Sequence, residues 1–357
     1  GWAFFNALHD SRSASDLELL SALHHAGERG ELLAYFQPVV HANDYSPAGC
    51  EALDGLDPDG GGGGSGGGAF TGGFVFIRAT GGRNVYVVDD EGDPNSPLQL
   101  TTQGFAYEPT VAPSGQSVAY MYRPGGGARE LRTVPTTGQG QPSTVFALPN
   151  SACSGCTDLR YPRFNPSSGF IVFTAIRGST SNLARVNVDG SGFVLLPNTT
   201  GSVNFFGAAS FYPDGQTVLS AAGASSSQMN TLVRTNVTSG ASDVISFNLG
   251  NEALTVVNRA VVSPDGSRVA FDGQTSSGTT AIFVGQLSQV LGSVTRLTRH
   301  TGEASASDFW PSWRGSTEVG FLSNAGGNEN IYRISAASSG AGSLVVPSAA
   351  EPSYGGR

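Results

Sequence analysis

The stretch AVVSPDGSRVAFDG, residues 260–273, holds an apolar run, a Ser-Pro-Asp-Gly corner and a second run in which apolar and polar residues alternate. Proline presets φ for a turn, and Asp-Gly supplies the positive φ of a tight hairpin, so the stretch predicts two antiparallel strands. Four related stretches occur elsewhere, the last of which keeps the glycine but lacks the corner proline. They are TVAPSGQSVAY (110–120), RFNPSSGFIVF (163–173), SFYPDGQTVLS (210–220) and PSWRGSTEVGF (311–321).

The repeated unit is longer than the hairpin. After the corner at 263–266 the sequence predicts strands at 268–272, 280–287 and 294–298, and one strand, 259–262, precedes the corner. The corner prolines Pro113, Pro166, Pro213 and Pro264 recur at intervals of about fifty residues, within the range of repeat folds. Four strands per repeat are typical of the blades of a β-propeller.

The two ends of the repeat region complement each other. Complete units start near residues 109, 162, 208, 259 and 311, whereas 74–101 carries FVFIR, NVYVVD and LQLT without a preceding first strand. The C-terminal EPSYGG (351–356) resembles a first strand and corner, as in EPTVAPSG (108–115), with nothing after it. We therefore expect an all-β fold, a six-bladed propeller over 73–357 in which N- and C-terminal strands close one blade and protect its edges.

Two segments precede the repeats. In 1–49, Ser15 and Glu18 fit a helix capping box, and Leu17, Leu20 and Leu23 fit one helical face. A second short helix is expected at 30–37, before Pro38. This helical arm is too short to bury a core of its own, so its apolar face must rest on the propeller or on a partner. Residues 50–72, with the glycine run DPDGGGGGSGGGAFTG (57–72), form a tether by composition.

The head of the arm, GWAFFNAL, carries Trp2, Phe4 and Phe5 close together. Aromatic side chains dominate interface hot spots, so these residues and the three leucines are candidates for binding a protein partner. Two alternatives stay open: the same side chains pack on the propeller, or Trp2 contacts a membrane interface.

The charge balance narrows the class of partner. The net charge is −9, and all 19 basic residues are arginine, so lysine-dependent chemistry by this chain is excluded. An acidic chain without basic clusters does not fit nucleic acid or anionic membrane surfaces. No apolar run reaches the roughly 18 residues of a membrane-spanning helix.

The pattern SPDGSRVAF (263–271), the strand AIFVG (281–285) and the closing RLT (296–298) resemble the repeats of TolB-type propellers; EVGFLS (318–323) followed by NIYRIS (330–335) is a second instance. The resemblance covers 73–357. It implies a periplasmic propeller that contacts partners in an envelope complex through an N-terminal segment and one propeller face. The same repeats also form the propeller of prolyl-oligopeptidase-like enzymes. The arm and glycine tether do not resemble the N-terminal domain of TolB, so the identity of the partner does not carry over.

Catalytic motifs are scarce. Four of the five histidines lie in the arm, which leaves His300 in the propeller, and the Gly-x-Ser-x-Gly pattern at 63–67 falls within polyglycine. A prolyl-oligopeptidase-like triad is therefore not expected. No cofactor is expected, although a Ca²⁺ site from oxygen ligands of the channel stays open. Asp214 and Asp265 are interpreted as turn residues, and Trp310 and Trp313 as blade packing rather than a ligand platform.

The three cysteines lead to separate predictions. Cys153 and Cys156 form a C-x-x-C pair between two blades, without the βαβ setting of a redox site or the histidine of a haem site, and we predict a local disulfide. Free thiols are the alternative. Cys50, in PAGC (47–50), partly resembles a lipoprotein cleavage box, but 30–46 is a poor export signal. Lipidation of Cys50 is excluded if residues 1–49 are kept.

The sequence thus favours a non-catalytic scaffold or accessory subunit, periplasmic or peripheral to the membrane, that docks in a bacterial envelope complex. The alternative is a propeller enzyme, or a binder of a small ligand or metal, that uses the channel.

Overall fold

The computed structural model describes residues 36–40, 47–52, 70–247, 254–287, 290–291, 294–300 and 305–356. The chain divides into two compact units, Gly1–Gly64 and Ser65–Arg357. In the first unit, β1 (Phe36–Val40) and β2 (Pro47–Ala52) pair antiparallel. Phe36 and Gln37, the end of the predicted second helix, therefore lie in a strand, and that part of the prediction is wrong. The rest of the two predicted helices, with Ser15 and Glu18, lies outside the described residues.

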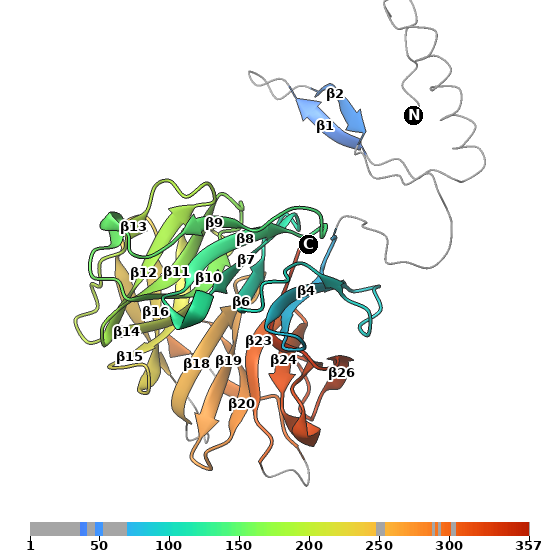
Figure 1. The fold of residues 1–357 in the computed structure, drawn as a ribbon. Helices are drawn as coiled ribbons and strands as arrows, with labels where there is room; N and C mark the ends of the chain where they lie inside the picture. Colours follow the sequence, from blue (N-terminus) through green and yellow to red (C-terminus); the bar gives the residue numbers. More distant parts are fainter. Residues whose placement is uncertain are drawn as a thin grey trace, which may run out of the picture. The chain divides into compact units, whose positions relative to one another are not determined.

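The second unit is a six-bladed β-propeller, as the repeats predicted (Figure 1). Blade 1 has the order β27-β3-β4-β5, blade 2 β6-β7-β8-β9, and blade 3 β10-β11-β12-β13. The strands of these blades are β27 (Ala350–Gly355), β3 (Gly73–Arg78), β4 (Asn84–Asp89), β5 (Leu98–Gln99), β6 (Ala106–Val111), β7 (Ser117–Tyr122), β8 (Glu130–Pro135), β9 (Ser143–Phe146), β10 (Asp158–Phe164), β11 (Phe170–Arg177), β12 (Thr180–Asn187) and β13 (Val194–Leu195).

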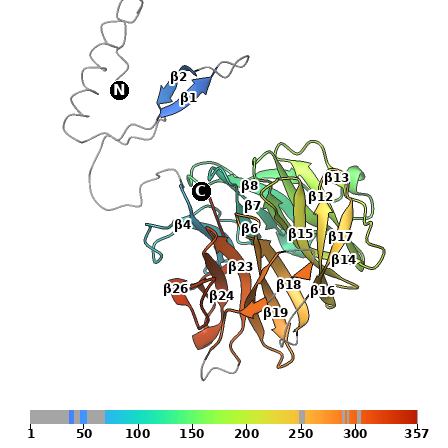
Figure 2. The same cartoon turned by 180° about the vertical axis from the view of Figure 1, so that it is seen from behind.

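Blades 4 to 6 follow in chain order, and the turned view shows them from behind (Figure 2). Blade 4 gains a fifth strand, because β21 from the loop of blade 5 pairs parallel with β17. The strands are β14 (Phe205–Phe211), β15 (Thr217–Gly223), β16 (Met229–Asn236) and β17 (Ser242–Phe247) in blade 4; β18 (Leu254–Val262), β19 (Arg268–Thr275), β20 (Thr280–Gln286), β21 (Val290–Leu291) and β22 (Val294–Arg296) from blade 5; and β23 (Asp308–Arg314), β24 (Glu318–Ser323), β25 (Asn330–Ser335) and β26 (Ser343–Val346) in blade 6.

The predicted closure is present in blade 1. The C-terminal β27 pairs antiparallel with β3, with Ser353 opposite Val75 and Tyr354 opposite Phe74. Figure 1 shows the C-terminal end of the propeller beside the strands that begin it. Because the first strand of blade 1 comes from the opposite end of the chain, the ring of blades has no open seam.

The core lies between neighbouring blades, where buried faces of adjacent sheets meet. Phe173 and Phe146 pack between blades 2 and 3, and Phe271 stacks on Phe283 within blade 5 with ring centroids 5.4 Å apart. Full burial of each such ring contributes on the order of 2–3 kcal/mol. The strand after the corner, β19, is buried along almost its whole length rather than on alternate residues, and β7, β11 and β15 are buried in the same way, because a neighbouring blade covers each face.

The Pro-Asp-Gly corners behave as turns. Asp214 accepts the N–H groups of Gln216 and Thr217, both at 2.9 Å. Asp265 accepts the Ser263 hydroxyl and the N–H of Ser267, and these hydrogen bonds hold its pKa below the usual range. The interpretation of both aspartates as turn residues is confirmed.

Candidate binding site in the propeller channel

The first strand of every blade carries a bulge where it faces the channel. The pairing register shifts within β6, β10, β14, β18, β23 and β27. In four of these strands the bulge residue has a positive φ of 52–57°, and a proline follows it: Glu108, Tyr161, Trp310 and Glu351. A bulge re-aims the side chains that follow, so the same place in each blade presents its side chain to the channel.

Buried carboxylates hold these bulges by accepting backbone N–H groups from the next blade. Glu351 accepts from Glu108 at 2.5 Å, and Glu108 accepts from Tyr161 at 2.6 Å. Both carboxylates also pair with an arginine: Arg83 binds Glu351, and Arg160 binds Glu108, each at 2.5 Å. The negative charges of the two glutamates are thus compensated inside the blades.

Asp272 in β19 does the same between blades 5 and 6. It accepts the N–H of Arg259 at 2.7 Å and the N–H of Trp310 at 3.1 Å. Its side chain is almost fully buried, and burial raises its pKa to about 6 against the opposing effects of Arg259 and the two N–H groups. A carboxyl this strongly desolvated is charged at neutral pH at a cost in stability.

Two arginines of the channel have no carboxylate within ion-pair distance among the described residues. The guanidinium of Arg259 lies over the rings of Tyr161 and Trp310. That of Arg163 donates only to two hydroxyls, Thr110 at 3.3 Å and Ser353 at 3.2 Å. Burial, and then the neighbouring Arg259, lower the pKa of Arg163 to about 10, so it still carries its charge at neutral pH.

Arg163 lines two adjoining cavities. The inner cavity, of about 30 Å³, lies at the bulges and is lined also by Thr110 and Ser353. The outer cavity, of about 390 Å³, opens between the corners and is lined also by Ser210 and Ser312. Its wider walls are aromatic and its rim is formed by corner prolines: Phe164, Phe211, Tyr212, Trp313 and Tyr354, with Pro113, Pro166, Pro213 and Pro264. We call this opening the corner mouth.

Trp310 and Trp313, for which the sequence analysis weighed blade packing against a ligand platform, differ in the structure. Trp313 is buried and donates its indole N–H to the carbonyl of Val261 at 2.8 Å, so it ties blade 6 to blade 5 while one edge lines the corner mouth. Trp310 is half-buried at the inner cavity and stacks with Arg259. Blade packing therefore describes Trp313 but not Trp310.

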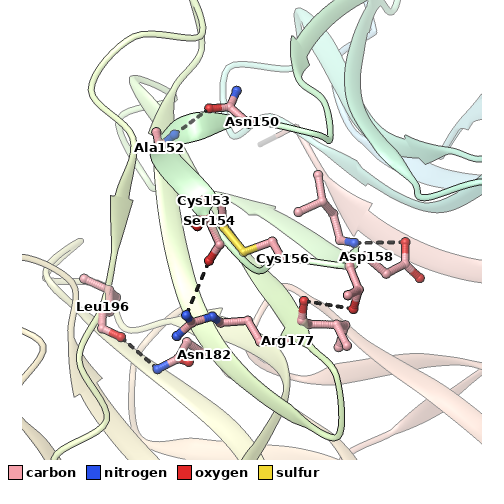
Figure 3. Close-up of a disulfide and its surroundings, with 12 residues drawn as sticks. Asn150, Ala152, Cys153, Ser154, Cys156, Asp158, Arg177, Asn182 and Leu196 are labelled. Carbon is pink, nitrogen blue, oxygen red and sulfur yellow. Dashed lines mark hydrogen bonds between the residues drawn. A yellow bond between two sulfur atoms is a disulfide. The ribbon is translucent and has the colours of Figure 1, made fainter.

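The sulfur atoms of Cys153 and Cys156 are joined in a disulfide within the loop between blades 2 and 3 (Figure 3). Cys153 is buried against the core of these blades, and Arg177 of β11 donates to the carbonyl of Ser154 at 3.3 Å. The crosslink fastens the loop where the chain enters the first strand of blade 3.

The remaining sequence-derived candidates are the aromatic and leucine residues of 1–49, Cys50 and His300. Trp2, Phe4, Phe5, Leu17, Leu20 and Leu23 lie outside the described residues. Cys50 lies in β2, opposite Pro38. His300 contacts both carboxylate oxygens of Asp308 at 3.0 Å. Within the described ranges, no three His, Cys, Asp or Glu side chains gather closely enough to hold a metal ion.

The polar channel residues escaped the sequence analysis, although a signal for them exists. Thr110, Arg163, Ser210 and Val261 each stand three residues before a corner proline, and Ser312 and Ser353 stand three before Gly315 and Gly356. Aligning the repeats on the corner would have placed these six residues in one ring.

The comparison with solved structures supports the fold. No family model matches the sequence, and no curated protein matches it. Among solved structures, TolB from Acinetobacter baumannii is similar with a TM-score of 0.59 and 16% identity, over 80% of this chain and 67% of that one. A putative TolB from Agrobacterium tumefaciens has a TM-score of 0.49 and 15% identity, over 74% and 84%. A puromycin-hydrolysing peptidase of Mycobacterium tuberculosis has 0.47 and 16%, over 68% and 38%.

The protein is therefore a six-bladed β-propeller with a polar channel. In fold it is a TolB-like propeller, as the repeat motifs indicated. No helix in the described part of the chain is both long and apolar enough to cross a membrane.

Proposed function

We propose that the protein is a non-catalytic interaction scaffold, an accessory subunit that docks through its corner mouth in a periplasmic or membrane-peripheral complex of the bacterial envelope. The observation that carries the proposal is the corner mouth itself, a concave surface with aromatic walls and a proline rim. Aromatic side chains supply most of the binding energy at protein interfaces, and prolines lose little entropy when a partner binds.

The titratable groups of the channel support a binding role over a catalytic one. The carboxylates of Glu108, Glu351 and Asp272 accept backbone N–H groups, and those of the two glutamates also pair with arginines, so all three have structural roles. His300, the one propeller histidine, is held by Asp308. A hydrolytic triad needs a base hydrogen-bonded to a nucleophile, and no such pair is found among the described residues.

In this proposal residues 1–49 act as a second contact. Trp2, Phe4, Phe5 and the leucines Leu17, Leu20 and Leu23 supply apolar side chains that bind the same partner or its neighbour. The glycine-rich tether keeps this second contact at high effective concentration once the propeller has docked.

The test is purification of the tagged full-length chain from the native organism in mild detergent, with mass spectrometry of the intact chain and of the bound proteins. We expect one partner at fixed stoichiometry. Ser114→Arg adds charge and bulk beside the exposed Pro113 on the rim and should abolish copurification of that partner. Ser179→Arg is the matched control, since Ser179 is exposed in the turn between β11 and β12, on the opposite face of the propeller.

Loss of the partner with both variants, or with neither, would contradict docking at the corner mouth. Deletion of 1–49 tests the second contact separately. The partner should then dissociate faster, and an unchanged dissociation rate would show that the N-terminal segment takes no part. Recovery of a lone monomer from every preparation would overturn the scaffold proposal as a whole.

A further inference from the structure

Arg163 is a cation without an anionic partner. Its guanidinium lies in the channel with two neutral hydroxyls as its hydrogen-bond acceptors, and a second cation, Arg259, lowers its pKa further. Arg163 is half-buried, and a partly desolvated charge without a counterion is costly, so a ligand that supplies the missing negative charge would stabilise it.

The residues around Arg163 offer further donors and few free acceptors. Arg163 shares its ring position with four hydroxyl residues on other blades: Thr110, Ser210, Ser312 and Ser353. Ser210 accepts the N–H of Val262 at 3.0 Å, and Ser312 accepts the N–H of Tyr354 at 2.7 Å. No hydrogen bond donated by the Ser210 or Ser312 hydroxyl is found among the described residues, so both protons are available to a ligand.

These donors converge on a cavity large enough for a small molecule. Arg163, Ser210 and Ser312 all line the corner mouth of about 390 Å³, and Arg163 also lines the inner cavity. Thr110 and Ser353 hold the guanidinium from the inner side through one nitrogen, Nη1. The other guanidinium nitrogens have no hydrogen bond to the described residues and can meet a carboxylate side by side.

We propose that Arg163, with Ser210 and Ser312, forms a binding site for the carboxylate group of a small organic acid that enters through the corner mouth. The planar fork of one guanidinium, with hydroxyl donors beside it, matches the two oxygens of a carboxylate group. The aromatic walls formed by Trp313, Tyr354 and Phe211 suit the organic part of such a ligand. This site goes beyond the scaffold role, which requires no small ligand.

Titration calorimetry of the full-length chain tests the site with three probes: succinate, inorganic phosphate, and a blocked peptide that contains one aspartate. We expect saturable binding of succinate, weakened about tenfold or more by Arg163→Gln, since a hydrogen-bonded ion pair is lost. Arg163→Lys keeps the charge but not the planar fork, so its affinity for succinate should lie between those of the wild type and Arg163→Gln. Arg333→Gln, which removes an exposed arginine of blade 6, should leave the affinity within about twofold.

A melting curve for each variant establishes that it is folded before titration. Binding of the aspartate peptide but not of succinate, with the same loss in Arg163→Gln, would support the carboxylate site and assign the carboxylate to a polypeptide. Binding of phosphate alone, absence of binding by succinate and the peptide, or equal affinity in wild type and the folded Arg163 variants would overturn the proposal.

Discussion

The carboxylate of Glu351 accepts the backbone N–H of Glu108 at 2.5 Å, although 243 residues separate the two in the chain. Glu351 is the last bulge residue of the propeller and Glu108 the first in sequence, so this bond joins blade 1 to blade 2 at the channel. The closure of the ring is therefore fastened twice, by the pairing of β27 with β3 and by this contact on the inside.

Glu351→Ala should destabilise the whole propeller. The substitution leaves the N–H of Glu108 without an acceptor in a buried setting and Arg83 without its carboxylate. We expect a loss of about 2–4 kcal/mol in the free energy of unfolding, measured by urea denaturation. Glu351→Gln keeps an acceptor oxygen and should lose less. Glu91→Ala, at an exposed residue in the turn after β4, is the control and should change stability by less than about 0.5 kcal/mol.

The repeats predicted the blades and the closure because both depend on local chemistry. A Pro-Asp-Gly corner favours a hairpin turn, and short apolar runs on either side of such a turn indicate strands. The leftover strands at 74–101 and 351–356 then had one partner each. The second predicted helix failed at Phe36 and Gln37 because a short apolar run fits a helix or a strand, and periodicity alone does not distinguish them.

The channel site depends on contacts that no local pattern contains. A bulge inserts one residue and leaves the alternation on either side intact, so Tyr161 and Trp310 gave no sign of their positive φ. In the sequence alone, Arg163 is not distinguishable from any other polar residue of a predicted strand. Its lack of a counterion becomes visible only when Thr110 and Ser353, from two other blades, are known to be its neighbours.

Arg163→Met should stabilise the unliganded protein. The substitution removes a desolvated charge without leaving a carboxylate unpaired, and methionine has a similar length and flexibility. We expect the melting temperature to rise by about 2 °C or more, the effect of about 1 kcal/mol in a domain of this size. Arg333→Met, at an exposed residue, is the control and should leave the melting temperature unchanged. A large fall in the melting temperature of Arg163→Met would mean that the hydrogen bonds of Arg163 to the two hydroxyls outweigh the cost of its charge.

Asp272 should make stability depend on pH between about 4 and 6. Its pKa is raised to about 6 in the folded state from an ordinary value of 3.8, so the folded protein takes up a proton in this interval. The contribution of Asp272 to stability is then fully present below about pH 4 and is lost as pH rises through about 6. The difference amounts to at most about 3 kcal/mol.

Melting temperatures of the wild type and Asp272→Asn, measured from pH 4 to 7.5, check this dependence. Asparagine keeps an oxygen acceptor and has no charge, so the variant should gain stability relative to the wild type as pH rises through 6. Parallel curves over the whole range would show that the folded and unfolded states share the same pKa at Asp272.

The disulfide between Cys153 and Cys156 should contribute modestly to stability, because the loop it closes is only four residues long. Loop-closure entropy for so short a loop is worth about 2 kcal/mol, so reduction should lower the melting temperature by a few degrees without unfolding the propeller. Cys153→Ser should lower the stability of the propeller more than Cys156→Ser, since Cys153 is buried in the core of blades 2 and 3 whereas Cys156 is half-buried at its edge.

Melting curves with and without a phosphine reductant measure both effects, with a Cys50→Ser variant as the control that leaves this loop intact. An unchanged melting temperature on full reduction, verified by thiol alkylation, would show that the loop is held by its hydrogen bonds to β11 alone.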